Sequence, residues 1–123
     1  MTDVPAAPPG STAAAKRLWA SVVDDYELEP HEMVLLAQAC RTVSLLDHLD
    51  AEVRRDGAMV ESPQGRKAHP AAVEARQQSI ALARIVAALR LPMGSDGDQQ
   101  AGARPPRRVG ARGVYGIKLA RSA

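Results

Sequence analysis

Prolines and glycines divide this sequence into three stretches in which apolar residues recur at the three- and four-residue spacing of an α-helix. Ser11 or Thr12 can cap a first helix, which we expect to end near Leu28. The apolar residues expected on its buried, core-facing side are Leu18, Trp19, Val22, Val23 and Tyr26. Pro30 suits the first turn of a second helix, which we expect over residues 30–56 because no other proline or glycine interrupts that stretch. The spacing therefore constrains the chain to a mainly helical fold.

Residues 57–68 interrupt the helical spacing. Gly57 can take the left-handed conformation that often follows the last turn of a helix. Residues 58–60 and 66–68 are suited to two short strands, because the segment between them places Pro and Gly where a type I turn prefers them. We therefore expect a short β-hairpin after the second helix.

A third helix is expected to begin at Pro70 and to end between residues 89 and 91. Its apolar set comprises Val73, Ile80, Leu82, Ile85, Val86 and Leu89. The predicted fold class is mostly α: a three-helix core with a short β-hairpin between helices 2 and 3, a disordered N-terminus and a basic C-terminal arm. The predicted domains are a disordered N-terminal segment (1–10), a helical core and oligomerisation domain (11–92), and a linker with the basic arm (93–123).

The chain is poor in the bulky side chains that fill a large core, with one Trp, two Tyr and no Phe. A domain this lean often gains burial by self-association. The second helix is apolar over about two-thirds of its circumference, which is wider than the stripe of a typical surface helix. One stripe comprises Met33, Leu36, Ala39, Cys40, Val43, Leu46 and Val53, and a second comprises Val34, Leu45 and Leu49. The second stripe predicts either an oligomerisation surface or a core position between both other helices.

Charge is distributed unevenly along the chain. The last twenty residues hold six cations and no carboxylate, whereas the first 103 residues hold ten Lys and Arg against all fourteen Asp and Glu. The body therefore carries −4 and the tail +6, although the whole chain sums to only +2. We expect the tail to bind double-stranded DNA through Arg104, Arg107, Arg108, Arg112, Lys118 and Arg121. A merely solubilising tail, or an arm that binds an acidic protein, is the alternative.

The side chains that could carry chemistry are few and isolated. They are His31, His48, His69, the acidic run Asp47, Asp50 and Glu52, and the lone Cys40. The histidines lack partners at zinc-binding spacing and are interpreted as surface or capping residues. Asp50 can pair with Arg54 four residues on, so the acidic run is interpreted as a solvated face. Cys40 is interpreted as a buried hydrophobe. We expect a non-enzymatic protein without catalytic residues, metal or cofactor.

The sequence also indicates where the protein resides. A single cysteine excludes an intramolecular disulfide and is typical of a reducing compartment. An early Asp3 and three prolines stand where a signal peptide has a basic start and an apolar run. No uncharged apolar run reaches the ~20 residues of a membrane span. We expect a soluble cytoplasmic protein with no membrane partner.

An ordered set of short motifs spans residues 11–92. The motifs are Leu18-Trp19, Tyr26-Glu27-Leu28 leading into Pro30-His31-Glu32, the helix end Glu52-Val53-Arg54-Arg55-Asp56-Gly57, Gly65 in the hairpin, His69-Pro70, and Leu89-Arg90-Leu91-Pro92. In this order they resemble the small-subunit family of tailed-phage terminases. The resemblance implies a non-enzymatic DNA-packaging protein that assembles into a homo-oligomeric ring, binds phage DNA and presents it to the terminase large subunit, which holds the ATPase and nuclease. It also implies the bacterial host cytoplasm as the location.

Two other classes of protein remain open. A small helical adaptor or regulator would dock its basic arm on an acidic protein partner without binding DNA. A helix-turn-helix transcription factor is less favoured, because a recognition helix beginning at Pro30 would present an acid and apolar residues to the major groove.

Overall fold

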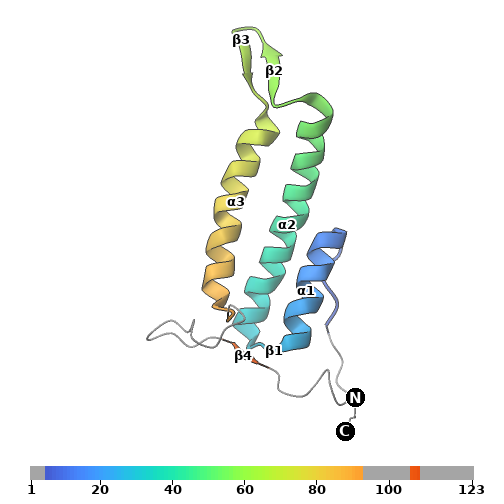
Figure 1. Ribbon diagram of the computed structural model, residues 1–123, viewed down its shortest axis with the longest axis vertical. Coiled ribbons are helices and arrows are strands. Elements are labelled where there is room, and N and C mark those ends of the chain that lie inside the picture. Colours follow the sequence, from blue (N-terminus) through green and yellow to red (C-terminus); the bar gives the residue numbers. More distant parts are fainter. Residues whose placement is uncertain (1–4, 93–105, 109–123) are drawn as a thin grey trace.

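Three helices form the body of the protein in the computed structural model, which describes residues 5–92 and 106–108. They are α1 (Ala13–Asp25), α2 (Pro30–Asp56) and α3 (Pro70–Leu89), and α2 packs against both of the others. A hairpin of β2 (Met59–Ser62) and β3 (Gly65–Ala68) connects α2 to α3 and projects beyond their ends (Figure 1). At the opposite end, β1 (Tyr26–Glu27) pairs antiparallel with β4 (Arg107–Arg108). The predicted fold class, three helices with a hairpin between the second and third, is confirmed.

The first helix begins where its cap was predicted. The Thr12 side chain accepts a hydrogen bond from the backbone N–H of Ala15 (3.4 Å), which satisfies one of the free donors of the first turn. α1 ends at Asp25, before the predicted Leu28, because Tyr26 takes an extended conformation and enters β1. The early end of the helix thus frees a short strand edge.

The second helix has the predicted bounds. Pro30 occupies its first turn, and the Glu32 side chain accepts the backbone N–H of Glu29 (2.7 Å). The chain leaves α2 at Gly57, whose φ of 86° lies in the region that favours glycine. The boundaries of α2 therefore follow from local residue chemistry alone.

Hydrogen bonds at its turn and at its base hold the hairpin together. Ser62 lies opposite Gly65 in the register of β2 and β3, and the Ser62 hydroxyl donates to the Gly65 carbonyl (2.5 Å). The backbone N–H of His69 donates to the Ala58 carbonyl (2.7 Å) and closes the base of the hairpin. Every residue of β3 is exposed, so the hairpin adds almost nothing to the core.

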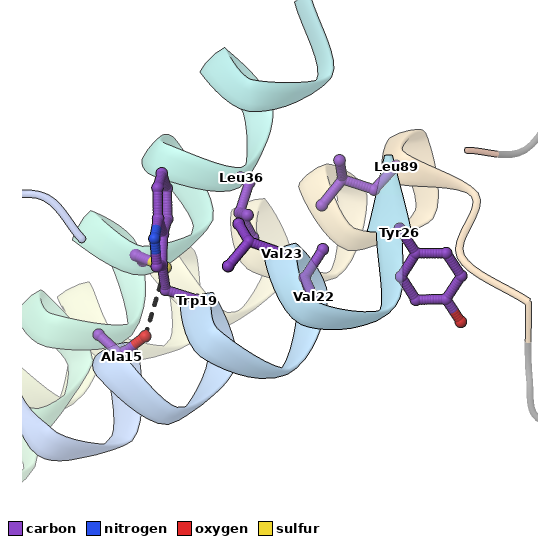
Figure 2. Packing of buried hydrophobic residues seen from close by; sticks show 8 residues of the cluster. Ala15, Trp19, Val22, Val23, Tyr26, Leu36 and Leu89 are labelled. Atoms are coloured by element: carbon purple, nitrogen blue, oxygen red, sulfur yellow. Dashed lines mark hydrogen bonds between the residues drawn. The ribbon is translucent and has the colours of Figure 1, made fainter. Parts of the chain in front are cut away.

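The core lies where α1 meets the first half of α2 and the end of α3 (Figure 2). It comprises Ala15, Trp19, Val22, Val23, Tyr26, Leu36, Cys40 and Leu89. Trp19 is only 7% exposed, and its indole N–H donates to the Pro5 carbonyl (2.7 Å), so its single polar atom is satisfied. The predictions that Trp19 and Cys40 are core residues are confirmed.

Burial is concentrated at this end of the molecule. Between Ser44 and Leu89, only His69 and Ala71 are buried. The reason is the length of α1, because its N-terminus lies beside Ser44 of α2. The Ser44 hydroxyl accepts a hydrogen bond from the Thr12 backbone N–H (3.0 Å). Beyond this point α2 and α3 pack on each other without a third helix (Figure 1).

The ordered body begins earlier than the predicted boundary at residue 11. Besides the contact of Pro5 with the indole, Ala7 packs against the core and Pro8 is buried. The Pro8 carbonyl accepts the Ser11 hydroxyl (2.7 Å). Residues 5–10 therefore lie against α1, which differs from the predicted disorder of this segment, and residues 1–4 lie outside the described part.

Within residues 5–92 and 106–108, no helix is long and apolar enough to cross a membrane.

Candidate nucleic-acid interface

Two residues of the predicted DNA-binding set, Arg107 and Arg108, lie within the described part of the chain, where they form β4. Arg107 is paired with Glu27 and Arg108 with Tyr26 in the antiparallel register of β4 on β1. The other four predicted cations, Arg104, Arg112, Lys118 and Arg121, lie outside the described residues. The arm therefore meets the body at the strand edge that α1 leaves free.

The first arm contact is an ion pair. The Arg107 Nε donates to Oε1 of Glu27 at 2.9 Å, and its Nη2 contacts the same oxygen. The two side chains are 80% and 52% exposed. Exposed pairs of this kind contribute only about 0–1 kcal/mol and weaken further in salt. The contact is therefore readily broken.

The second arm contact is with an aromatic ring. The Arg108 guanidinium carbon lies 5.5 Å from the centroid of the Tyr26 ring, within the range of a cation–π interaction, and Nη1 donates to the Tyr26 hydroxyl (3.3 Å). Tyr26 is itself 9% exposed and belongs to the core cluster. The sequence identified Tyr26 only as a core residue and did not anticipate this second contact.

Of the three predicted oligomerisation residues, two are exposed and one is half-buried in the single chain. Val34 is 68% exposed, Leu45 is 39% exposed and Leu49 is half-buried. Val34 and Leu45 lie eleven residues apart, which places them on one face of α2 at about 100° per residue. That face is therefore partly apolar and open to solvent in the single chain.

The apolar residues that the sequence grouped into one set on the third helix differ in their exposure. Val73, Ile80 and Val86 are 41%, 47% and 42% exposed, whereas Leu89 is buried and Leu82 and Ile85 are half-buried. Periodicity alone could not separate these residues, because they surround most of the helix. Val73 and Ile80, seven residues apart, share the outer face.

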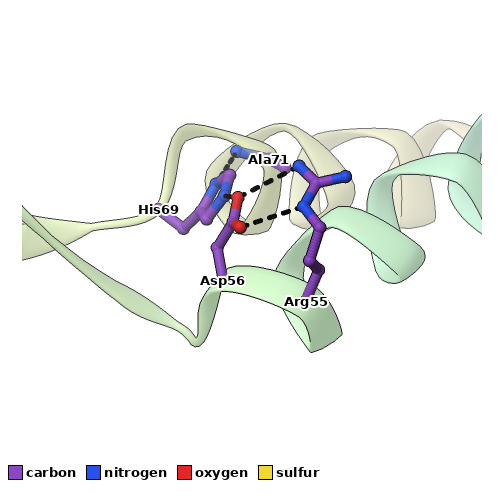
Figure 3. A network of polar contacts seen from close by, with 4 residues as sticks. All are labelled: Arg55, Asp56, His69 and Ala71. Carbon is purple, nitrogen blue, oxygen red and sulfur yellow. Dashed lines mark hydrogen bonds and ion pairs between the residues drawn. The ribbon is translucent and has the colours of Figure 1, made fainter.

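Figure 3 shows a polar network at the base of the hairpin. The His69 Nδ1 accepts the backbone N–H of Ala71 (2.9 Å) and so caps α3, as predicted for a capping histidine. Because Nδ1 accepts, the proton of the neutral ring resides on Nε2, which lies 2.9 Å from the Asp56 carboxylate. Asp56 also accepts from the Arg55 guanidinium at 3.0 and 3.2 Å. The network joins the end of α2 to the start of α3.

The hydrogen bonds from Arg55 and His69 lower the pKa of Asp56 from 3.8 to about 2. The folded state therefore favours the ionised carboxylate, and this stabilisation is present above the ordinary pKa and is lost as pH falls from about 4 to about 2.

We expect the stability of Asp56→Asn to fall less steeply than that of the wild type between about pH 4 and about pH 2, because the variant lacks this carboxylate. Urea unfolding midpoints, followed by circular dichroism, measure the stability. Asp50→Asn, which removes the predicted and observed surface pair with Arg54, is the matched control and should retain the wild-type slope. Parallel curves for Asp56→Asn and the wild type would contradict this assignment.

Cys40 is fully buried, and its thiol lies 3.4 Å from the Ala15 carbonyl. Burial raises the pKa of this thiol, which keeps it protonated and unreactive at neutral pH. Its predicted role as a small core residue is confirmed.

Comparisons of the chain with protein-family models, with curated proteins and with solved structures found no match.

Proposed function

We propose that the protein is a viral DNA-packaging protein, a terminase small subunit that assembles into a ring, binds phage DNA through its basic arm and presents it to the large subunit. The ordered motifs of residues 11–92, which resemble that family, lie in a helical body with the expected hairpin. The proposal assigns self-association to the body and DNA binding to the arm.

The observation that carries the proposal is the lack of burial between Ser44 and Leu89, where only His69 and Ala71 are shielded from solvent. Two packed helices with this little core are poorly stabilised in water, because burial of apolar area is the main favourable term in folding. The exposed apolar residues of this region include Leu45 and Ile80, which are suited to a subunit contact. Association of copies would supply the missing burial.

The DNA assignment follows from charge. The tail carries six cations without a carboxylate, and guanidinium groups suit phosphate oxygens. Arg107 already forms such a forked contact with a carboxylate oxygen of Glu27. Several arms on one ring would bind one duplex with an avidity that a single arm lacks.

The same contact supports a second candidate function. An arm that pairs with Glu27 can pair with carboxylates of another protein, as expected for a small helical adaptor. Salt-sensitive binding to an acidic protein such as the large subunit, without binding to duplex DNA, would favour the adaptor over the packaging protein.

Leu45→Asp tests the subunit contact. Because this substitution would place an unpaired carboxylate in the interface, we expect it to weaken self-association by at least about 30-fold, corresponding to about 2 kcal/mol. Light scattering measures the mass, and circular dichroism checks that the helices persist. Ala51→Asp adds the same charge at another exposed position of α2 and should leave the mass unchanged. A wild-type mass for Leu45→Asp would exclude this face from the interface.

A further inference from the structure

We infer that the Tyr26–Glu27 strand is a docking site for the protein's own basic arm, and that docking competes with a polyanion for Arg107 and Arg108. The inference rests on the proposed role of the arm in DNA binding. It adds an intramolecular contact that restrains the arm until a polyanion displaces it.

Three kinds of contact converge on the same strand edge. The backbones of β4 and β1 pair, Glu27 binds the Arg107 guanidinium, and the ring and hydroxyl of Tyr26 engage Arg108. Pro106, directly before β4, is buried. The paired side chains lie 80 and 82 residues apart along the chain, so these are tertiary contacts and not part of a local turn.

The surroundings of the docking site are acidic. Residues 18–40 hold five carboxylates (Asp24, Asp25, Glu27, Glu29 and Glu32) and neither Lys nor Arg. A strand with two guanidinium groups therefore meets a favourable potential at this end of the body, whereas DNA meets an unfavourable one. Electrostatics thus favours the arm over DNA at this edge of the body.

The guanidinium groups of Arg107 and Arg108 cannot contact both the docking site and a polyanion at the same time. The Nε and Nη2 atoms of Arg107 both point at one oxygen of Glu27, and these are the atoms with which Arg binds a phosphate in a forked geometry. The Arg108 guanidinium lies over Tyr26 and so has one face occupied. An arm on DNA must therefore leave Glu27 and Tyr26.

The expected restraint is modest for one arm. An exposed ion pair shifts an equilibrium by about 1.4- to 5-fold, and the apparent affinity of the arm falls by the fraction of molecules in which it is docked. Where several arms bind one duplex, this factor applies to each of them. The affinity of a ring for one duplex is then lowered by the product of these factors.

Trypsin cleavage measures docking without any DNA. Trypsin cuts after Arg107 and Arg108 but not after Arg104, which precedes proline. A paired strand is protected, so cleavage follows the undocked population. We expect Glu27→Gln, which retains the side-chain shape, to speed cleavage at Arg107 and Arg108 by about 1.4- to 5-fold. Glu52→Gln makes the same change of charge on exposed α2 and should cleave at the wild-type rate. Equal rates for both variants would overturn the docking site.

Fluorescence anisotropy with a short labelled DNA duplex at low salt tests the competition. Glu27→Gln should bind about 1.4- to 5-fold more tightly than Glu52→Gln, which corrects for the change in net charge. Equal affinities of the two variants would overturn the competition while leaving DNA binding intact. Absence of binding by wild type and both variants would instead overturn the proposed DNA function and the competition with it, whereas the protease result would still decide whether the arm docks.

Discussion

Deletion of residues 104–123 is expected to weaken binding to duplex DNA by at least about 100-fold at low salt. The number of subunits in the oligomer should stay the same. The deletion removes six cations, and contacts of six cations with phosphates give a log–log salt slope of about −5 in the full-length protein. Such a slope corresponds to about a thousandfold loss of affinity between 50 and 200 mM salt. Gel-shift titrations at several salt concentrations measure both quantities.

Two variants sharpen this test. Replacing all six cations by Gln keeps the length of the arm and should reproduce the deletion, because the effect is one of charge. Replacing only Arg107 and Arg108 by Gln should reduce the magnitude of the salt slope by about 2, since each phosphate contact contributes about 0.9. Unchanged affinity after the deletion would assign DNA binding to the body or exclude it altogether.

Trp19→Ala is expected to lower the free energy of unfolding by about 3–5 kcal/mol. The ring is 7% exposed, belongs to the cluster that contains nearly all of the buried apolar side chains, and holds the N-terminal segment through the Pro5 carbonyl. Urea unfolding followed by circular dichroism measures the loss, because the variant has no other Trp to follow by fluorescence. The wild type and the variant are measured at equal protein concentration, because association of subunits makes the apparent stability depend on concentration.

Trp19→Phe separates packing from hydrogen bonding. It keeps an aromatic ring and removes the indole N–H, so we expect a smaller loss than for alanine. If Trp19→Ala costs less than about 1 kcal/mol, the ring contributes little to the core and its burial in the single chain has another role.

The sequence predicted the boundaries of α2 and α3 because local residue chemistry determines them. Pro30 and Pro70 fit the first turn of a helix, Gly57 takes a positive φ that other residues avoid, and the hairpin turn needs its Gly65. His69 likewise caps α3 through its own ring nitrogen. Each of these signals acts within a few residues and can be recognised without knowledge of the tertiary contacts.

Features that depend on distant contacts were not predictable from the sequence. Helical spacing could not show that α1 reaches only to Ser44, nor which apolar residues of α3, such as Val73 and Ile80, are exposed. The burial of Ser44, a polar residue, follows from its hydrogen bond with the N-terminus of α1 rather than from any local pattern. The pairing of β1 with β4 joins segments that no turn connects, so local propensity carries no signal for it.

The most direct test of the central proposal is the solution mass of the full-length protein by light scattering, with and without a short DNA duplex at low salt. We expect a discrete oligomer of ring size whose mass increases when DNA binds. A monomer whose mass is unaffected by DNA would contradict both the subunit contact and the role of the arm.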